Sequence, residues 1–193
     1  MNIEEKINNL VSTNQLDKAI RLTEEKLAIL PQTDFHKIIG RNLLHLTEQL
    51  INYIDKFYDI AQNEIEVQAI YSEMNGFTIN YDLWFIDLFA FTECGGLDDL
   101  DWLADFEVSS DESMIISGFE DLQSAYEDYM ENEKWEDHTL KEASEICELL
   151  IILRLQELFK EIKKLATDRR LNWVNISLFT TAHDSEMVYE AKV

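Results

Sequence analysis

A dense run of carboxylates between positions 93 and 112 is the part of this sequence whose residue types most clearly offer chemistry. Eight Asp and Glu residues lie there, with Trp102 and Phe106 among them. Exposed carboxylates speed the encounter with a basic protein, and an aromatic side chain that fills a pocket can anchor the complex. We predict a protein-binding loop whose contact residues are Asp98, Asp99, Asp101, Trp102, Asp105, Phe106, Glu107, Asp111 and Glu112. The alternative is a solvated loop whose aromatic residues turn inward, and we expect Trp102 to lie in the core.

The same loop, 93–112, could instead bind a divalent cation. Asp98, Asp99 and Asp101 offer the oxygen ligands that Ca²⁺ and Mg²⁺ prefer, so a metal-dependent enzyme or a cation-binding protein is the alternative function. An EF-hand loop, however, needs acids at alternate positions, then Gly, then Glu at position twelve. The loop has no Gly at the required place. We therefore predict neither a metal nor another cofactor.

Other residues with catalytic potential show no informative spacing. The four histidines are scattered without ligand spacing, and His183 is next to Asp184 in an expected turn, where adjacent side chains point apart. The chain contains none of the motifs of nucleophile elbows, zinc proteases, P-loops or dinucleotide-binding folds. Cys94 and Cys147 are far apart and not in CxxC spacing, which favours two reduced thiols. We predict no catalytic residues and expect that the protein is not an enzyme.

The negative charge is concentrated in the middle of the chain. The net charge is −23, and residues 57–133 contain 20 Asp and Glu but no Lys, Arg or His. Residues 1–56 and 134–193 carry only −1 and −2. Charges of one sign repel and destabilise a fold, so a basic protein, bound cations or a high-salt habitat must offset them. A halophile would spread acid over the whole surface, and the near-neutral flanks argue against that habitat.

This charge also excludes two classes of partner. Affinity for nucleic acid comes from Lys and Arg contacts with phosphates, so we expect no direct nucleic-acid binding. Anionic lipid headgroups would repel the protein, so we expect no membrane. The first ten residues lack the apolar centre of a signal peptide, and no apolar run approaches the ~20 residues that span a bilayer. We therefore expect a cytoplasmic protein.

Apolar periodicity predicts a helical N-terminal region over residues 1–62. Residues 3–12 and the stretch from Asn14 to Pro31 have apolar residues at helical spacing, with proline ending the second helix. Residues 34–62 are predicted to form one longer helix, in which Gly40 allows close packing against a neighbour. With 46 % apolar residues and only 5 Gly and 1 Pro, the chain favours a folded core, long helices and short connections.

From about residue 65 the period changes to two, which predicts strands in the region 63–193. Asn75-Gly76 suits a two-residue hairpin turn, and residues 84–91 suit a central strand with Asp87 as its anomaly. A loop or short helical turns over 97–107 and a short strand at 113–117 should follow. Two helices are then expected, at 118–132 with a Ser117/Glu120 capping box and at 140–167 with a Thr139/Glu142 capping box. Two alternating runs, 173–181 and 186–193, should close the chain as a hairpin.

Together these elements predict an α+β fold. Three N-terminal helices are followed by an antiparallel sheet with two further helices packed on it. The regions 1–62 and 63–193 are expected to form one compact domain.

The middle of the chain resembles a family of small bacterial proteins. The stretch NGFTINYDLWFIDLFAFTECGGLDDLDWLADFE and the following SGFEDLQSAY are similar to immunity proteins of bacterial polymorphic toxin systems, over roughly residues 66–130. The resemblance implies a cytoplasmic protein without catalytic residues that binds and blocks one cognate toxin domain. It assigns no role to any individual residue, because these families share no common motif. The remaining alternative is an adaptor or nucleic-acid mimic for another basic protein.

Overall fold

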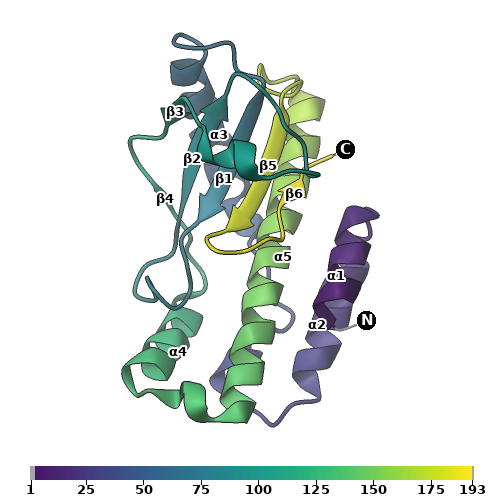
Figure 1. Ribbon diagram of the computed structural model, residues 1–193, viewed down its shortest axis with the longest axis vertical. Coiled ribbons are helices and arrows are strands. Elements are labelled where there is room, and N and C mark those ends of the chain that lie inside the picture. Colours follow the sequence, from purple (N-terminus) through teal and green to yellow (C-terminus); the bar gives the residue numbers. More distant parts are fainter. Residues whose placement is uncertain (1–2, 193) are drawn as a thin grey trace.

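Helices cover one face of a six-stranded sheet in the computed structural model, which describes residues 3–192 (Figure 1). The α-helices are α1 (Ile3–Ser12), α2 (Leu16–Ala28), α3 (Thr47–Ala61), α4 (Glu120–Glu131) and α5 (His138–Arg169). The 3-10 helices are η1 (Asp34–Ile38), η2 (Leu44–Leu46), η3 (Asp101–Ala104) and η4 (Lys134–Glu136). The strands are β1 (Ala69–Met74), β2 (Phe85–Phe91), β3 (Val108–Ser109), β4 (Met114–Ile115), β5 (Ser177–Ala182) and β6 (Tyr189–Glu190). The predicted α+β class and the order of N-terminal helices before the sheet are confirmed.

The sheet is mixed rather than purely antiparallel. Its order is β3-β2-β1-β5-β6, with β4 also paired to β2. β1 runs antiparallel to β2 but parallel to β5, with Ala69 opposite Ser177. A parallel pair requires a long crossover connection, and the 32-residue helix α5 lies within that connection. The sequence pattern identified every strand except β3, and it did not reveal this crossover, because periodicity carries no information about strand direction.

The long helix predicted over residues 34–62 is wrong. The segment contains η1 and η2, and the α-helix proper begins only at Thr47. Gly40 lies between the two short helices with φ +76°, a conformation that L side chains rarely adopt. A Cβ built on Gly40 would meet no atom within 4 Å. Glycine therefore serves the backbone here and not the close helix packing that we expected.

The predicted two-residue turn at Asn75-Gly76 is also wrong. The ladder between β1 and β2 ends where Met74 faces Ile86, and the intervening residues form a longer loop. The buried side chain of Asn75 closes this loop by donating to the Leu83 carbonyl at 2.8 Å and accepting from the Phe85 amide at 2.8 Å. The sequence favoured a tight turn because asparagine readily adopts turn backbone conformations. In the structure it is the Asn75 side chain that matters, because its hydrogen bonds hold the two ends of the longer loop together.

Both predicted capping boxes are corrected by the structure. Helix α5 is capped by Asp137, whose Oδ1 accepts from the backbone amides of Thr139 and Leu140 at 2.8 and 3.1 Å. Helix α4 has no side-chain cap from Ser117. Glu120 is instead the first helical residue, and its side chain accepts from the Gly118 amide at 2.8 Å, one residue before the N-cap Phe119.

Two hydrophobic clusters lie on opposite faces of the sheet. The main core joins the helices to the inner face, where Ile86, Leu88 and Ala90 alternate along β2 as predicted and Trp84 continues the pattern just before the strand. It includes residues of both predicted regions and surrounds α5. The smaller cluster lies on the outer face and comprises Ala69, Tyr71, Phe91 and Phe179, with Trp102 and Leu103 packed against it. Among residues 3–192, no helix has the length and hydropathy needed to cross a membrane.

Candidate protein-binding surface

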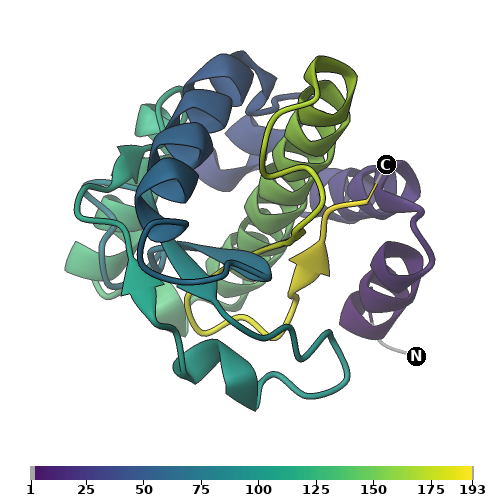
Figure 2. The same cartoon turned by 90° about the horizontal axis from the view of Figure 1, so that it is seen from above.

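Residues 93–112, called the acidic loop from here on, cross the outer face of the sheet and carry η3. Figure 2 shows η3 on the side of the sheet opposite α3 and α5. All eight carboxylates of the loop belong to exposed residues. None of them forms an ion pair with any residue of the described range 3–192. The loop therefore presents negative charge that the protein itself does not neutralise.

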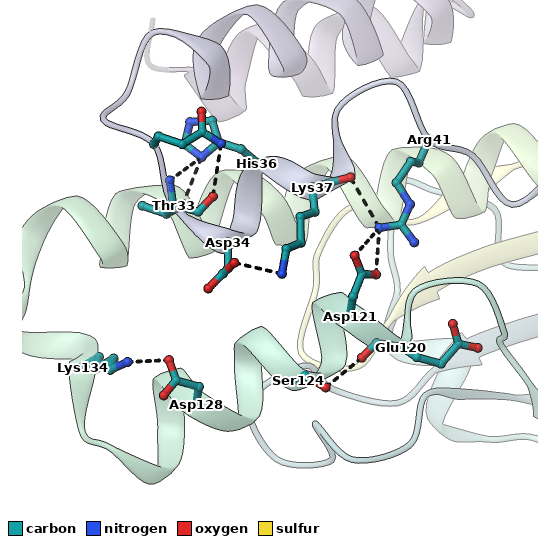
Figure 3. Close-up of polar contacts among 11 residues, drawn as sticks. Thr33, Asp34, His36, Lys37, Arg41, Glu120, Asp121, Ser124, Asp128 and Lys134 are labelled. Atoms are coloured by element: carbon teal, nitrogen blue, oxygen red, sulfur yellow. Dashed lines mark hydrogen bonds and ion pairs between the residues drawn. The ribbon is translucent and has the colours of Figure 1, made fainter.

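The acidic residues of α4 provide a contrast, because the chain pairs two of them with its own cations. Arg41 Nη1 lies 2.8 Å from Asp121 Oδ1, and Lys134 pairs with Asp128 (Figure 3). Although burial acts in the opposite direction, the Arg41 guanidinium lowers the pKa of Asp121. The hydrogen bond from Lys134 likewise lowers the pKa of Asp128. These carboxylates join α4 to its neighbours through ion pairs, a role that the carboxylates of the acidic loop do not have.

The two aromatic residues of the loop differ in what they contact. Trp102 is half-buried, with its ring centroid 4.7 Å from that of Phe91 and 5.3 Å from that of Phe179. Trp102 therefore turns inward and holds the loop on the sheet, but it is half-buried against the outer-face cluster and not in the core as expected. Phe106 remains 44 % exposed and touches Phe89 at a centroid distance of 4.8 Å. Of the two aromatic residues of the loop, Phe106 is the more exposed and the better placed to act as an anchor for a partner.

Local contacts explain why the loop follows this path. The Trp102 indole donates to the Gly96 carbonyl at 3.0 Å. A Cβ on Gly95 would lie 2.3 Å from Trp102 Cδ1, so only glycine leaves room for the ring. Glu107 accepts from the backbone amide of Thr92 at 3.2 Å, which closes the base of the loop. Of the predicted contact residues, Trp102 and Glu107 thus also fix the loop conformation.

Asp111 and Glu112 lie apart from η3, beyond strand β3. The Tyr53 hydroxyl of α3 donates to the Glu112 carbonyl at 2.6 Å, which holds this segment beside the helix. A cavity of about 290 Å³ lies between the segment and α3, with Lys56 and Ile60 in its lining. The predicted contact residues therefore form two neighbouring parts, one over the sheet and one at its edge, rather than one continuous cluster.

A polar group that the sequence did not reveal lies at the end of β1 on the same outer face. Glu73 and Asp87 occupy directly opposite positions of the ladder. Glu73 accepts from the Tyr71 hydroxyl at 2.8 Å and lies 2.8 Å from His183 Nδ1. The hydrogen bond with Glu73 raises the pKa of His183. Asp87, the predicted anomaly, accepts from the Ser113 hydroxyl at 2.6 Å.

The acidic residue nearest to His183 is therefore Glu73 on the neighbouring strand β1, and not Asp184 beside it in the sequence. Its Nε2 lies 3.6 Å from Asp184 Oδ1, whereas Nδ1 lies 2.8 Å from Glu73 Oε1. The sequence separation of Glu73 and His183 hid this pair, and only the parallel pairing of β1 and β5 brings the two residues together.

Metal-binding geometry is absent from the described part of the chain. Within residues 3–192, no group of three or more His, Cys, Asp and Glu side chains is arranged to hold a metal ion. Cys94 is exposed and Cys147 is buried, and both are free thiols. The carboxylates of the acidic loop spread over a surface instead of converging on one point.

Comparison of the chain with protein-family models, curated proteins and solved structures gives no match.

Proposed function

We propose that this protein inhibits a basic protein by binding it through the acidic loop. The observation that carries the proposal is the set of eight exposed loop carboxylates without an ion-pair partner in the described structure. These unpaired carboxylates repel one another, and this repulsion destabilises the free protein. A basic partner would relieve that repulsion on binding and would be drawn to the surface by it.

The proposed partner is a toxin domain of a bacterial polymorphic toxin, and the proposed role is that of its immunity protein. Toxin domains that act on nucleic acid need a basic surface to hold phosphates. An acidic surface that covers this basic site would exclude the substrate without any chemistry of its own. Phe106, at 44 % exposure, provides an apolar contact in the acidic surroundings. This combination of an aromatic anchor and steering charge is typical of tight inhibitor interfaces.

Two other functions compete with this proposal. An adaptor or nucleic-acid mimic would use the same surface but accept several basic partners, so partner number separates it from an immunity protein. A metal-dependent function would need converging ligands, and the spread of Asp98, Asp99 and Asp101 over an exposed loop does not favour it.

Capture of partners from an extract of the source cells tests the proposal. The protein is immobilised at low salt, and bound proteins are eluted with rising salt, since screening weakens surface charge interactions. We expect one basic protein in the salt eluate, and we expect its activity to stop when this protein is added in equal amount. Recovery of several unrelated basic proteins would favour the adaptor. A captured protein whose activity persists at saturating inhibitor would contradict the inhibitory role.

A further inference from the structure

A second acidic feature lies away from the centre of the acidic loop, between α1 and the turn that joins β5 to β6. Two adjoining cavities of about 440 and 300 Å³ share Asn8, Glu186 and Met187 in their linings. Figure 2 shows α1 beside the β5–β6 hairpin. Asn8 belongs to α1, and Glu186 and Met187 belong to the connection between β5 and β6. We call the two cavities together the α1 groove.

The larger cavity of the α1 groove combines an apolar lining with several carboxylates. Its apolar residues include Phe77, Leu149 and Ile152. Its acidic residues are Glu4, Glu145, Glu148, Asp184 and Glu186, and no Lys or Arg is in its lining. An Arg or Lys side chain has the complementary structure, because its aliphatic stem packs on apolar surface while its cationic head reaches acidic groups.

Glu148 is the one of these acids that is not exposed. It is partly buried, and no hydrogen bond or ion pair to another described residue serves its carboxylate. Burial and then the nearby charge of Glu145 raise the pKa of Glu148 to about 7. Its neighbours in the protein interior, Cys147 and Tyr126, are neutral, because burial raises the pKa of both. Neither of them supplies a positive charge to Glu148.

The other charged groups that line the same cavity come from α1 and from the β5–β6 turn. They are Glu4, His183, Asp184 and Glu186. His183 is the only base among them, and it lies against Glu73 at 2.8 Å. An incoming cation would therefore meet mainly negative groups.

The α1 groove continues toward the acidic loop. Leu97, at the start of that loop and 43 % exposed, lines the smaller cavity together with Val11. The one lysine in this lining, Lys192, is paired with Glu190 at 2.7 Å. A segment of a partner bound on the acidic loop could thus extend along the groove without meeting an unpaired cation of this chain.

We propose that the α1 groove receives an extended basic segment of the same partner, with an Arg or Lys side chain placed between Glu145 and Glu148. This inference rests on the proposed function and adds a second contact site to it. The groove supplies shape and apolar contact, and the acidic loop supplies long-range attraction. Charge complementarity and continuity with the loop select a basic peptide segment over a neutral one.

NMR titration of the full chain tests this site without knowledge of the partner. The probe is N-acetyl-arginine amide, and N-acetyl-citrulline amide is the matched neutral control of the same shape. We expect the arginine probe to shift the methyl signals of Ile79 and Ile152, while the citrulline probe leaves them unchanged. The Glu148 carboxyl signal should titrate with a midpoint lowered by about one pH unit when arginine is bound, since a nearby cation favours the carboxylate.

Single substitutions complete the test. Glu148→Gln and Glu145→Gln should each weaken the arginine-dependent shifts, whereas Asp168→Asn, on the exposed end of α5, should leave them intact. Equal shifts with the arginine and citrulline probes, or no shift at either isoleucine, would overturn the groove site. If a basic protein is still captured in that case, the proposed function survives and only the groove fails. Arginine binding in the groove without capture of any basic protein would overturn the proposed function and, with it, the assignment of the groove to that partner.

Discussion

Trp102 and Phe106 are four positions apart in the acidic loop but have different surroundings and should respond differently to mutation. Trp102→Ala removes contacts with Phe91 and Phe179, and we expect a loss of about 3 kcal/mol in the free energy of unfolding. Phe106→Ala, at a 44 % exposed position, should cost less than about 1 kcal/mol of stability but weaken partner binding at least ~tenfold. Urea unfolding and binding titration of both variants check this. Unchanged affinity in Phe106→Ala would remove it as the anchor.

Glu148 makes stability depend on pH in a defined direction. Its carboxyl has a pKa of about 7 in the folded state, against an ordinary value of 4.5, so the folded protein holds the proton more tightly than the unfolded chain. The wild-type protein therefore loses stability as pH rises from 4.5 to 7, and the loss levels off above 7. Relative to wild type, Glu148→Gln should be stabilised by about 3 kcal/mol at pH 8 and by less than about 1 kcal/mol at pH 5.

Urea unfolding of Glu148→Gln and wild type at the two pH values measures this difference. The exposed neighbour Glu145 provides a control, because Glu145→Gln should change stability much less. An equal effect of Glu148→Gln at pH 5 and pH 8 would show that the carboxyl is not desolvated in the folded protein.

At the scale of elements, the start of α5 offers a direct test of the corrected cap. Asp137→Ala removes the acceptor for two backbone amides and should lower stability by about 1 kcal/mol. Thr139→Ala, at the position that the sequence pattern favoured as the cap, should change stability by only a few tenths of a kcal/mol. Thermal unfolding of the two variants separates them. A larger loss in Thr139→Ala than in Asp137→Ala would restore the original prediction.

Elements with strong periodicity were predictable from sequence, and their connections were not. The alternation of Trp84, Ile86 and Leu88 identified β2 and its buried face. By contrast, Gly40 and Asn75 were each assigned a common role of their residue type, and the fold uses each differently. The exposed acidic loop was also predictable from sequence, because its composition is unusual. The α1 groove remained hidden, because its lining comes from α1, α5 and two separate turns that only the tertiary structure brings together.

For the whole molecule, the unpaired charge of the acidic loop should lower the stability of the free protein while favouring the proposed binding of a basic partner. Replacing Asp98, Asp99, Asp101 and Asp105 with asparagine removes four negative charges. The amide side chain introduced at position 99 keeps an oxygen that can accept the hydrogen bond from the backbone amide of residue 101. We expect this variant to be more stable than wild type at 10 mM salt by on the order of 1 kcal/mol. The gain should shrink in 1 M salt, where the Debye length is only about 3 Å. Urea unfolding at both salt concentrations checks this, and a destabilised variant at low salt would contradict mutual repulsion in the loop.

The most direct measurement compares partner capture by three forms of the protein at low salt. The first is wild type, and the second is the variant with four asparagines in the acidic loop. The third, a control with the same change in net charge, carries Glu25→Gln, Glu64→Gln, Glu136→Gln and Asp168→Asn at exposed positions outside the loop. We expect wild type and the control to recover the same basic protein and the loop variant to lose it. Equal recovery by the loop variant and wild type would contradict binding through the acidic loop.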